Sequence, residues 1–219
     1  MFDEIGTQYY LGANNDTMDT TLYHFNYFIT LITGIFDNLA IKTDSHLNIN
    51  TKQKTRISLS TKSGKDFLKE IREKNPLIRD HIRQNNFLIQ LAYSFREKVI
   101  HQEGLDKSHF NNADFGWEAN VLKISQEQYN LIKNCGDSKI RPRALSKWSI
   151  HQTSNAYFMV PYNFVLEYMS MLLVFVNIYL ELLGYSPFIK KLKETTDTSK
   201  QTIFFVNKLE TFKAYHLGF

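Results

Sequence analysis

The long apolar segment over residues 157–183 constrains the fold of this chain more than any other feature. Its few polar residues follow one another at steps of four, three, seven and four: Asn163, Glu167, Ser170, Asn177 and Glu181. These steps place the polar side chains on one face of an α-helix, which is typical of the central helix of a soluble bundle. The N-terminus carries acids where a secretory signal needs Lys or Arg. We therefore predict a cytoplasmic protein with no membrane partner.

A helical period also marks the N-terminal part of the chain. Apolar residues at helical spacing predict a first helix over 17–41: Leu22, Phe25, Ile29, Ile32, Phe36 and Leu39. The turn-like residues 12–15 precede it, and Asp16 and Thr17 can cap it. The next stretch, 45–62, has β-branched residues and only short alternation, so we predict an extended or irregular segment there.

Two helix starts follow in the middle of the chain. Ser63 can cap a short helix over 64–74. Pro76 suits the first position of a second helix, which should run to about residue 102. The polar residues 103–124 then predict a loop over the surface.

The C-terminal half adds three further helices. Ser125 and Gln128 form a capping-box pattern that opens a short helix. The apolar segment predicts a helix that begins at Pro161 and ends at Gly184. A last amphipathic helix is predicted over 198–214.

These segments predict an all-α, up-and-down bundle of five or six helices, folded as a single domain over residues 1–219. No strand pattern recurs often enough to predict a sheet. Two basic segments, 45–62 and 138–160, are expected to be irregular. The hydrophobic share of 43% is enough for a core and excludes wholesale disorder. The single cysteine, Cys135, excludes an intramolecular disulfide framework.

The net charge of +4 is unevenly distributed along the chain. Residues 45–65 and 138–166 contain no acid and carry +5 and +4, which leaves −5 on the rest. Segregated charge of this kind is typical of a polyanion-binding surface, although two solvated loops would give the same pattern. Trp148 can stack on a base, although packing onto the bundle is the simpler interpretation. The second segment supplies the candidate RNA-binding residues: Lys139, Arg141, Arg143 and Lys147.

One pair of reactive side chains stands out near the end of the helix predicted to begin at Pro76. Arg96 and His101 lie about 140° apart around an ideal helix, so they meet only where the last turn unwinds. The carbonyls at a helix end favour an imidazolium there. A guanidinium can bind a phosphate, and an imidazole can take a proton from a ribose 2′-hydroxyl or return one to the leaving oxygen. The seven histidines show no pair at helical ligand spacing, so no metal site is predicted.

Arg96, four intervening residues and His101, at the end of a long helix in an all-α domain of this size, resemble the HEPN superfamily (higher eukaryotes and prokaryotes nucleotide-binding). The resemblance covers residues 16–184 and implies a metal-independent endoribonuclease without a cofactor. In it, Arg96 would bind phosphate and His101 would act as general acid or base. It also implies a homodimer in which the motif helices of two copies meet. Many members belong to toxin–antitoxin or defence systems, which implies an antitoxin or operon partner.

Glu97 departs from the family pattern, which commonly has Asn, Asp or His directly after the arginine. Its carboxylate can hold Arg96 or His101 in place, but it also repels phosphate. The leading prediction is therefore a ribonuclease that uses Arg96, His101 and Glu97, and the alternative is a non-catalytic module that binds RNA, a nucleotide or a protein. A third possibility is a helical scaffold whose apolar helix faces form a dimer.

Overall fold

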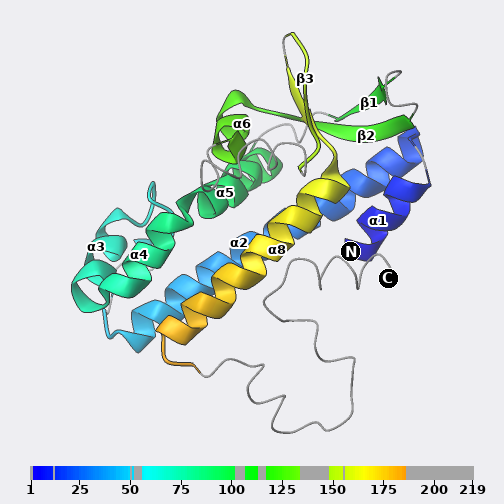
Figure 1. Cartoon of the computed structure of the whole chain (residues 1–219). Helices are drawn as coiled ribbons and strands as arrows, with labels where there is room; N and C mark the ends of the chain where they lie inside the picture. Colours follow the sequence, from blue (N-terminus) through cyan, green and yellow to red (C-terminus); the bar gives the residue numbers. More distant parts are fainter. Residues whose placement is uncertain are drawn as a thin grey trace, which may run out of the picture. The chain divides into compact units, whose positions relative to one another are not determined.

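The computed structural model describes residues 2–11, 13–49, 51, 56–101, 107–112, 117–133, 148–154 and 156–185 (Figure 1). Its secondary structure is mostly helical, as the sequence predicts. The chain divides into two compact units. The first unit contains residues 1–35 and 87–167, and the second contains residues 36–86 and 168–219.

The first unit contains α1 (Phe2–Tyr10), the N-terminal part of α2 (Asn15–His46), most of α5 (Asn86–His101), α6 (Gln126–Lys133) and the start of α8 (Pro161–Leu182). The long first helix is therefore present, but its cap is Asn14 rather than Asp16 or Thr17. The Asn14 side-chain oxygen accepts from the backbone N–H of Thr17 at 2.9 Å. The Asn14 N–H donates to the Thr17 hydroxyl oxygen at 3.1 Å, so each side-chain oxygen accepts from the backbone N–H of the other residue.

Four aromatic rings pack together in the core of the first unit. Phe25 of α2, Phe95 of α5 and Phe164 of α8 contact one another edge to face, with ring centroids 5.2–5.6 Å apart. Trp148 packs against Phe164 at 5.2 Å. All four side chains are buried. They hold α5 against α2 and α8 within this unit.

A four-stranded antiparallel sheet completes the first unit, in the order β1-β2-β4-β3. Its strands are β1 (Lys107–Asn112), β2 (Trp117–Ile124), β3 (Ile150–Gln152) and β4 (Tyr157–Met159). The predictions of a loop over 103–124, of an irregular segment over 138–160 and of no sheet are therefore wrong where these strands lie. The sheet depends on the pairing of Leu122 with Met159, which are far apart in the sequence. Two of the strands have three residues, too short for a visible alternation.

The start of α6 confirms the predicted capping box. The Gln128 N–H donates to the Ser125 hydroxyl at 3.2 Å, and the Ser125 N–H donates to the Gln128 side-chain oxygen at 2.8 Å. The helix ends at Lys133.

The second unit contains α3 (Lys65–Lys74), α4 (Pro76–Gln84), and the C-terminal parts of α2 and α8. Ser63 does not cap α3, because its hydroxyl donates to the Ser58 hydroxyl at 3.0 Å. The cap position is Gly64, where an added Cβ would lie 1.9 Å from the backbone oxygen of Ser58. Only glycine allows this approach of residues 58–60 to the helix start.

Pro76 begins α4 as predicted, and the Asn75 side chain caps it by accepting from the N–H of Ile78 at 3.2 Å. The single helix predicted from Pro76 to about residue 102 is wrong, because α4 ends at Gln84 and α5 begins at Asn86. The side-chain amide of Asn85 donates to the backbone oxygen of His81 at 2.9 Å. This bond satisfies a backbone carbonyl at the end of α4, where the predicted single helix is interrupted.

The predicted end of the apolar helix at Gly184 is confirmed within two residues. α8 ends at Leu182, and Gly184 adopts a φ of 80°. The N–H of Gly184 donates to the oxygen of Glu181 and the N–H of Tyr185 to that of Leu180, which is the Schellman arrangement.

Among the described helices, α8 alone is long and apolar enough to cross a membrane by length and composition, and 44% of its most apolar stretch is buried inside the protein. The helix predicted over 198–214 lies outside the described residues.

Candidate functional site

The end of α5 carries the residues that the sequence singles out. His101 is the last residue of this helix, and Arg96 and Glu97 lie between one and two turns before it. The sequence predicts that this helix runs to about residue 102, and residues 102–106 lie outside the described part of the chain; the predicted start at Pro76 is wrong. Arg96 is half-buried and Glu97 is exposed. The backbone of His101 is described but its side chain is not, so the approach of Arg96 to His101 stays a prediction.

Phe95 fixes the direction of its neighbours on α5. Its ring is fully buried between Phe25 and Phe164. The next residue, Arg96, is rotated by about 100° from it around the helix, which places the guanidinium at the margin of the core. Glu97 is rotated by a further 100° and faces solvent.

The candidate RNA-binding residues of the second basic segment lie outside the described residues: Lys139, Arg141, Arg143 and Lys147. Their neighbour Trp148 is buried against Phe164, which confirms the packing interpretation of this residue over base stacking.

The described basic side chains of the first basic segment are exposed, although Ser58, Leu59 and Ser60 between them are buried. Arg56 lies 3.5 Å from the Asp66 carboxylate, in a pair whose side chains are both largely exposed. Lys62 and Lys65 are exposed too. An exposed ion pair adds little stability, so Arg56 can exchange Asp66 for another anion at small cost.

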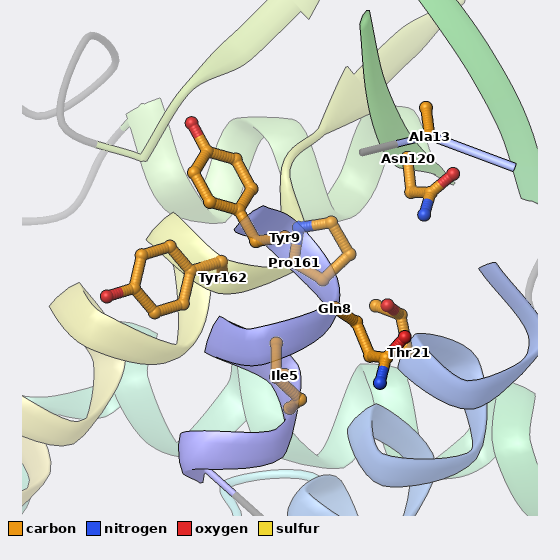
Figure 2. Close-up of a pocket in the computed structure, with 8 residues that line it drawn as sticks. All are labelled: Ile5, Gln8, Tyr9, Ala13, Thr21, Asn120, Pro161 and Tyr162. Atoms are coloured by element: carbon orange, nitrogen blue, oxygen red, sulfur yellow. The ribbon is translucent and has the colours of Figure 1, made fainter. Parts of the chain in front are cut away.

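A pocket that the sequence did not predict lies in the first unit (Figure 2). Its space is about 260 Å³, including open solvent. The lining residues come from α1, the residues between α1 and α2, and from α2, β2 and α8: Ile5, Gln8, Tyr9, Ala13, Thr21, Asn120, Pro161 and Tyr162. These residues are of ordinary structural types and are scattered along the chain, so no local pattern could have identified the pocket.

The polar groups of the pocket are uncharged and buried. The Gln8 side-chain amide donates to the Glu4 carboxylate at 2.8 Å, and that of Asn120 donates to the Thr17 hydroxyl at 2.9 Å. Tyr9 stacks on Tyr162 with ring centroids 5.0 Å apart. Burial raises the pKa of Tyr9, and burial together with the nearby Tyr10 raises the pKa of Tyr162 to about 12. Both phenols therefore stay protonated at neutral pH, and their hydroxyls point away from the other lining residues (Figure 2).

In the part of the chain that the structure describes, no three His, Cys, Asp or Glu side chains lie close enough together to hold a metal ion. No protein-family model, curated protein or solved structure matches the chain.

Proposed function

We propose that this chain is a HEPN-type, metal-independent endoribonuclease that works as a homodimer, with Arg96 and His101 at the end of α5 as its reactive pair. The observation that carries the proposal is the course of α5, which ends at His101 and holds Arg96 within its last two turns. The core contacts of Phe95 fix this helix against α2 and α8, so the position of Arg96 is set by rigid elements.

The proposed reaction transfers one proton from the attacking to the leaving oxygen. The imidazole of His101 takes the proton of a ribose 2′-hydroxyl, and the 2′-oxygen attacks the adjacent phosphorus. The bond from phosphorus to the 5′-oxygen breaks, which leaves a 2′,3′-cyclic phosphate, and the 5′-oxygen receives a proton. Arg96 binds the phosphate oxygens, where negative charge increases in the transition state.

The first prediction concerns these two residues. Arg96→Ala and His101→Ala should each lower the rate of RNA cleavage by about 100-fold or more, because each removes a group that acts in the transition state. The measurement is cleavage of a labelled single-stranded RNA in a buffer with a chelator, with identification of the cyclic phosphate product.

The chain offers matched controls for both variants. His46 is the last residue of α2, as His101 is of α5, and Arg83 lies in the last turn of α4. His46→Ala and Arg83→Ala should cleave at the parent rate. Equal cleavage by the parent, Arg96→Ala and His101→Ala would exclude the proposed reactive pair.

The exposed carboxylate of Glu97 favours a second candidate, a non-catalytic module that binds RNA. A negative charge beside Arg96 repels the phosphate of a bound RNA. This repulsion is stronger for the transition state, which carries additional negative charge, so the carboxylate opposes cleavage more than binding. In this case the parent protein binds RNA with an affinity that falls with salt, and it releases no product. Glu97→Gln then strengthens binding without producing cleavage.

A further inference from the structure

The pocket of the first unit has two kinds of lining (Figure 2). One part is apolar and consists of aliphatic side chains and aromatic rings: Ile5, Tyr9, Ala13, Pro161 and Tyr162. The other part is polar and uncharged: Gln8, Thr21 and Asn120. The exposed fractions of these three are 9%, 4% and 8%. The pocket therefore combines buried hydrogen-bonding groups with an apolar wall, which is typical of small-molecule sites.

The aromatic part of the wall packs closely against α1. Tyr10 contacts the rings of Tyr9 and Tyr162 edge to face. A Cβ added at Gly6 would lie 3.1 Å from the Tyr162 ring, so glycine at this position lets the ring approach the helix. Because the hydroxyls of Tyr9 and Tyr162 point away from the other lining residues, the rings present carbon atoms to the pocket (Figure 2). An apolar ring of a ligand can pack against them.

Hydrogen bonds fix the orientation of the two amides that line the pocket. The Gln8 nitrogen donates to the Glu4 carboxylate, which only accepts, so the nitrogen and not the oxygen of this amide faces Glu4. The Thr17 hydroxyl donates its hydrogen to the backbone oxygen of Asn14 at 3.1 Å, so it accepts from the Asn120 nitrogen. Each of these two bonds uses one N–H of an amide that has two. The amides therefore bring both acceptors and donors to the pocket.

The charge of this part of the chain disfavours an anionic ligand. Residues 1–41 supply five of the eight lining residues, and they contain no Lys or Arg. They contain five acids: Asp3, Glu4, Asp16, Asp19 and Asp37. Burial is the largest cause of the raised pKa of Tyr162, and the charge of Asp3 adds to it, so an acid acts on the lining. None of the lining side chains is ionised at neutral pH, so an ionic group inside the pocket would lose its hydration without gaining a counter-ion.

A carboxamide complements the polar part of the pocket. Its oxygen can accept from the Thr21 hydroxyl, and its N–H groups can donate to the Gln8 oxygen. A carboxylate has no hydrogen to donate to Gln8, and a ketone has none either. The space of about 260 Å³ includes open solvent, so a ligand with one six-membered ring can place its amide inside and keep its ring against the wall at the opening.

We propose that this pocket binds a small neutral molecule that carries a carboxamide group on a single apolar ring. The amide forms hydrogen bonds with Gln8 and Thr21, and the ring packs against Tyr9 and Tyr162. The site does not depend on the proposed reaction at the end of α5, because no residue of the proposed reactive pair lines it. A ligand that contacts α1, α2 and α8 together binds only the folded chain and therefore stabilises it.

The second prediction tests this site with benzamide in an NMR titration of the isotope-labelled full chain. Benzamide should shift the side-chain amide signals of Gln8 and Asn120, with a dissociation constant of about 1 mM for a ligand of this size. Benzoate has the same shape and a negative charge, and it should bind about tenfold more weakly or less. Acetophenone keeps the ring and the carbonyl but lacks the N–H groups, so it should bind about fivefold more weakly or less.

Two variants place the ligand in the pocket. Thr21→Val keeps the shape of the side chain and removes its hydroxyl, so it should raise the dissociation constant of benzamide about fivefold or more. Ala13→Phe should raise it about tenfold or more, because the new ring takes up part of the space. Thr33→Val is the matched control, since it removes a buried hydroxyl from the same helix outside the pocket. It should bind benzamide like the parent, and circular dichroism verifies that all three variants keep their helices.

Any of three results would overturn the proposal. The first is the absence of shifts at Gln8 and Asn120 up to about 20 mM benzamide. The second is equal binding of benzamide and either benzoate or acetophenone, which would mean that the pocket does not recognise a neutral amide. The third is parent-like binding by both Thr21→Val and Ala13→Phe, which would place the ligand elsewhere. Because the titration contains no RNA, each of these results is distinct from a failure of the nuclease assay.

Discussion

At the scale of single residues, Tyr179 illustrates how a hydroxyl is accommodated in the apolar interior of the second unit. Its hydroxyl lies 2.7 Å from the Thr43 hydroxyl, and both groups are buried. The Thr43 hydroxyl donates to the backbone oxygen of Leu39 at 2.8 Å, so its own hydrogen is used. Tyr179 must therefore be the donor to Thr43. Burial raises the pKa of Tyr179 to about 12, which keeps this donor protonated.

The direction of this bond gives the third prediction. Tyr179→Phe should lower the free energy of unfolding by about 1 kcal/mol, because one hydrogen bond is lost while Thr43 keeps its bond to Leu39. Thr43→Val should cost more, about 1–3 kcal/mol, because the buried Tyr179 donor loses its acceptor. Urea unfolding measures both, with Tyr185→Phe as an exposed control that should change little. A larger loss for Tyr179→Phe than for Thr43→Val would reverse the assigned donor.

At the scale of elements, the sequence predicts best the boundaries that local chemistry determines. The Ser125 capping box, the start of α4 at Pro76 and the end of α8 near Gly184 each depend on groups a few residues apart. The break at Asn85 falls inside a continuous apolar period, and Asn85 is an ordinary residue for a helix surface. The strands depend on partners far along the chain, which no local period reveals.

The candidate site also combines features that the local sequence predicts with features that only tertiary packing determines. The helical course of α5 as far as His101 was predictable from its apolar period. The half-buried position of Arg96 follows from the packing of Phe95, which is a tertiary fact. The pocket beside Tyr9 and Tyr162 brings together residues from α1 and α8, so it became visible only in three dimensions.

The fourth prediction concerns the start of α3. Gly64→Ala should lower the free energy of unfolding by about 2 kcal/mol or more, because the new Cβ would meet the backbone oxygen of Ser58, which cannot rotate away. Gly34→Ala is the matched control, and in dilute protein it should raise stability by up to about 1 kcal/mol through helix propensity. Urea unfolding measures both variants. Similar effects at the two glycines would contradict the close approach at Gly64.

At the scale of the whole molecule, burial disfavours the charged form of a described histidine in each unit, His81 and His151. His81 of the second unit stacks on Phe175 with ring centroids 4.8 Å apart, and its Nε2 lies 3.0 Å from the backbone oxygen of Phe175. The imidazole therefore donates from Nε2 to this carbonyl. Burial lowers the pKa of His81 below 6.5, although the bond to Phe175 opposes the shift. Burial also lowers the pKa of His151 on β3.

These two shifts determine how the stability of the chain depends on pH, which is the fifth prediction. As the pH falls through 6.5, the unfolded chain takes up protons on both histidines before the folded chain does, so the free energy of unfolding decreases. Above this range the contribution of both groups is fully present. The loss amounts to at most about 1.4 kcal/mol per pH unit for each histidine. His81→Gln should flatten the pH dependence below 6.5, whereas His46→Gln, an exposed control, should not. Urea unfolding at a series of pH values from about 7.5 to about 5 measures the slope, and an unchanged slope in His81→Gln would show that the buried imidazole is not the group that titrates.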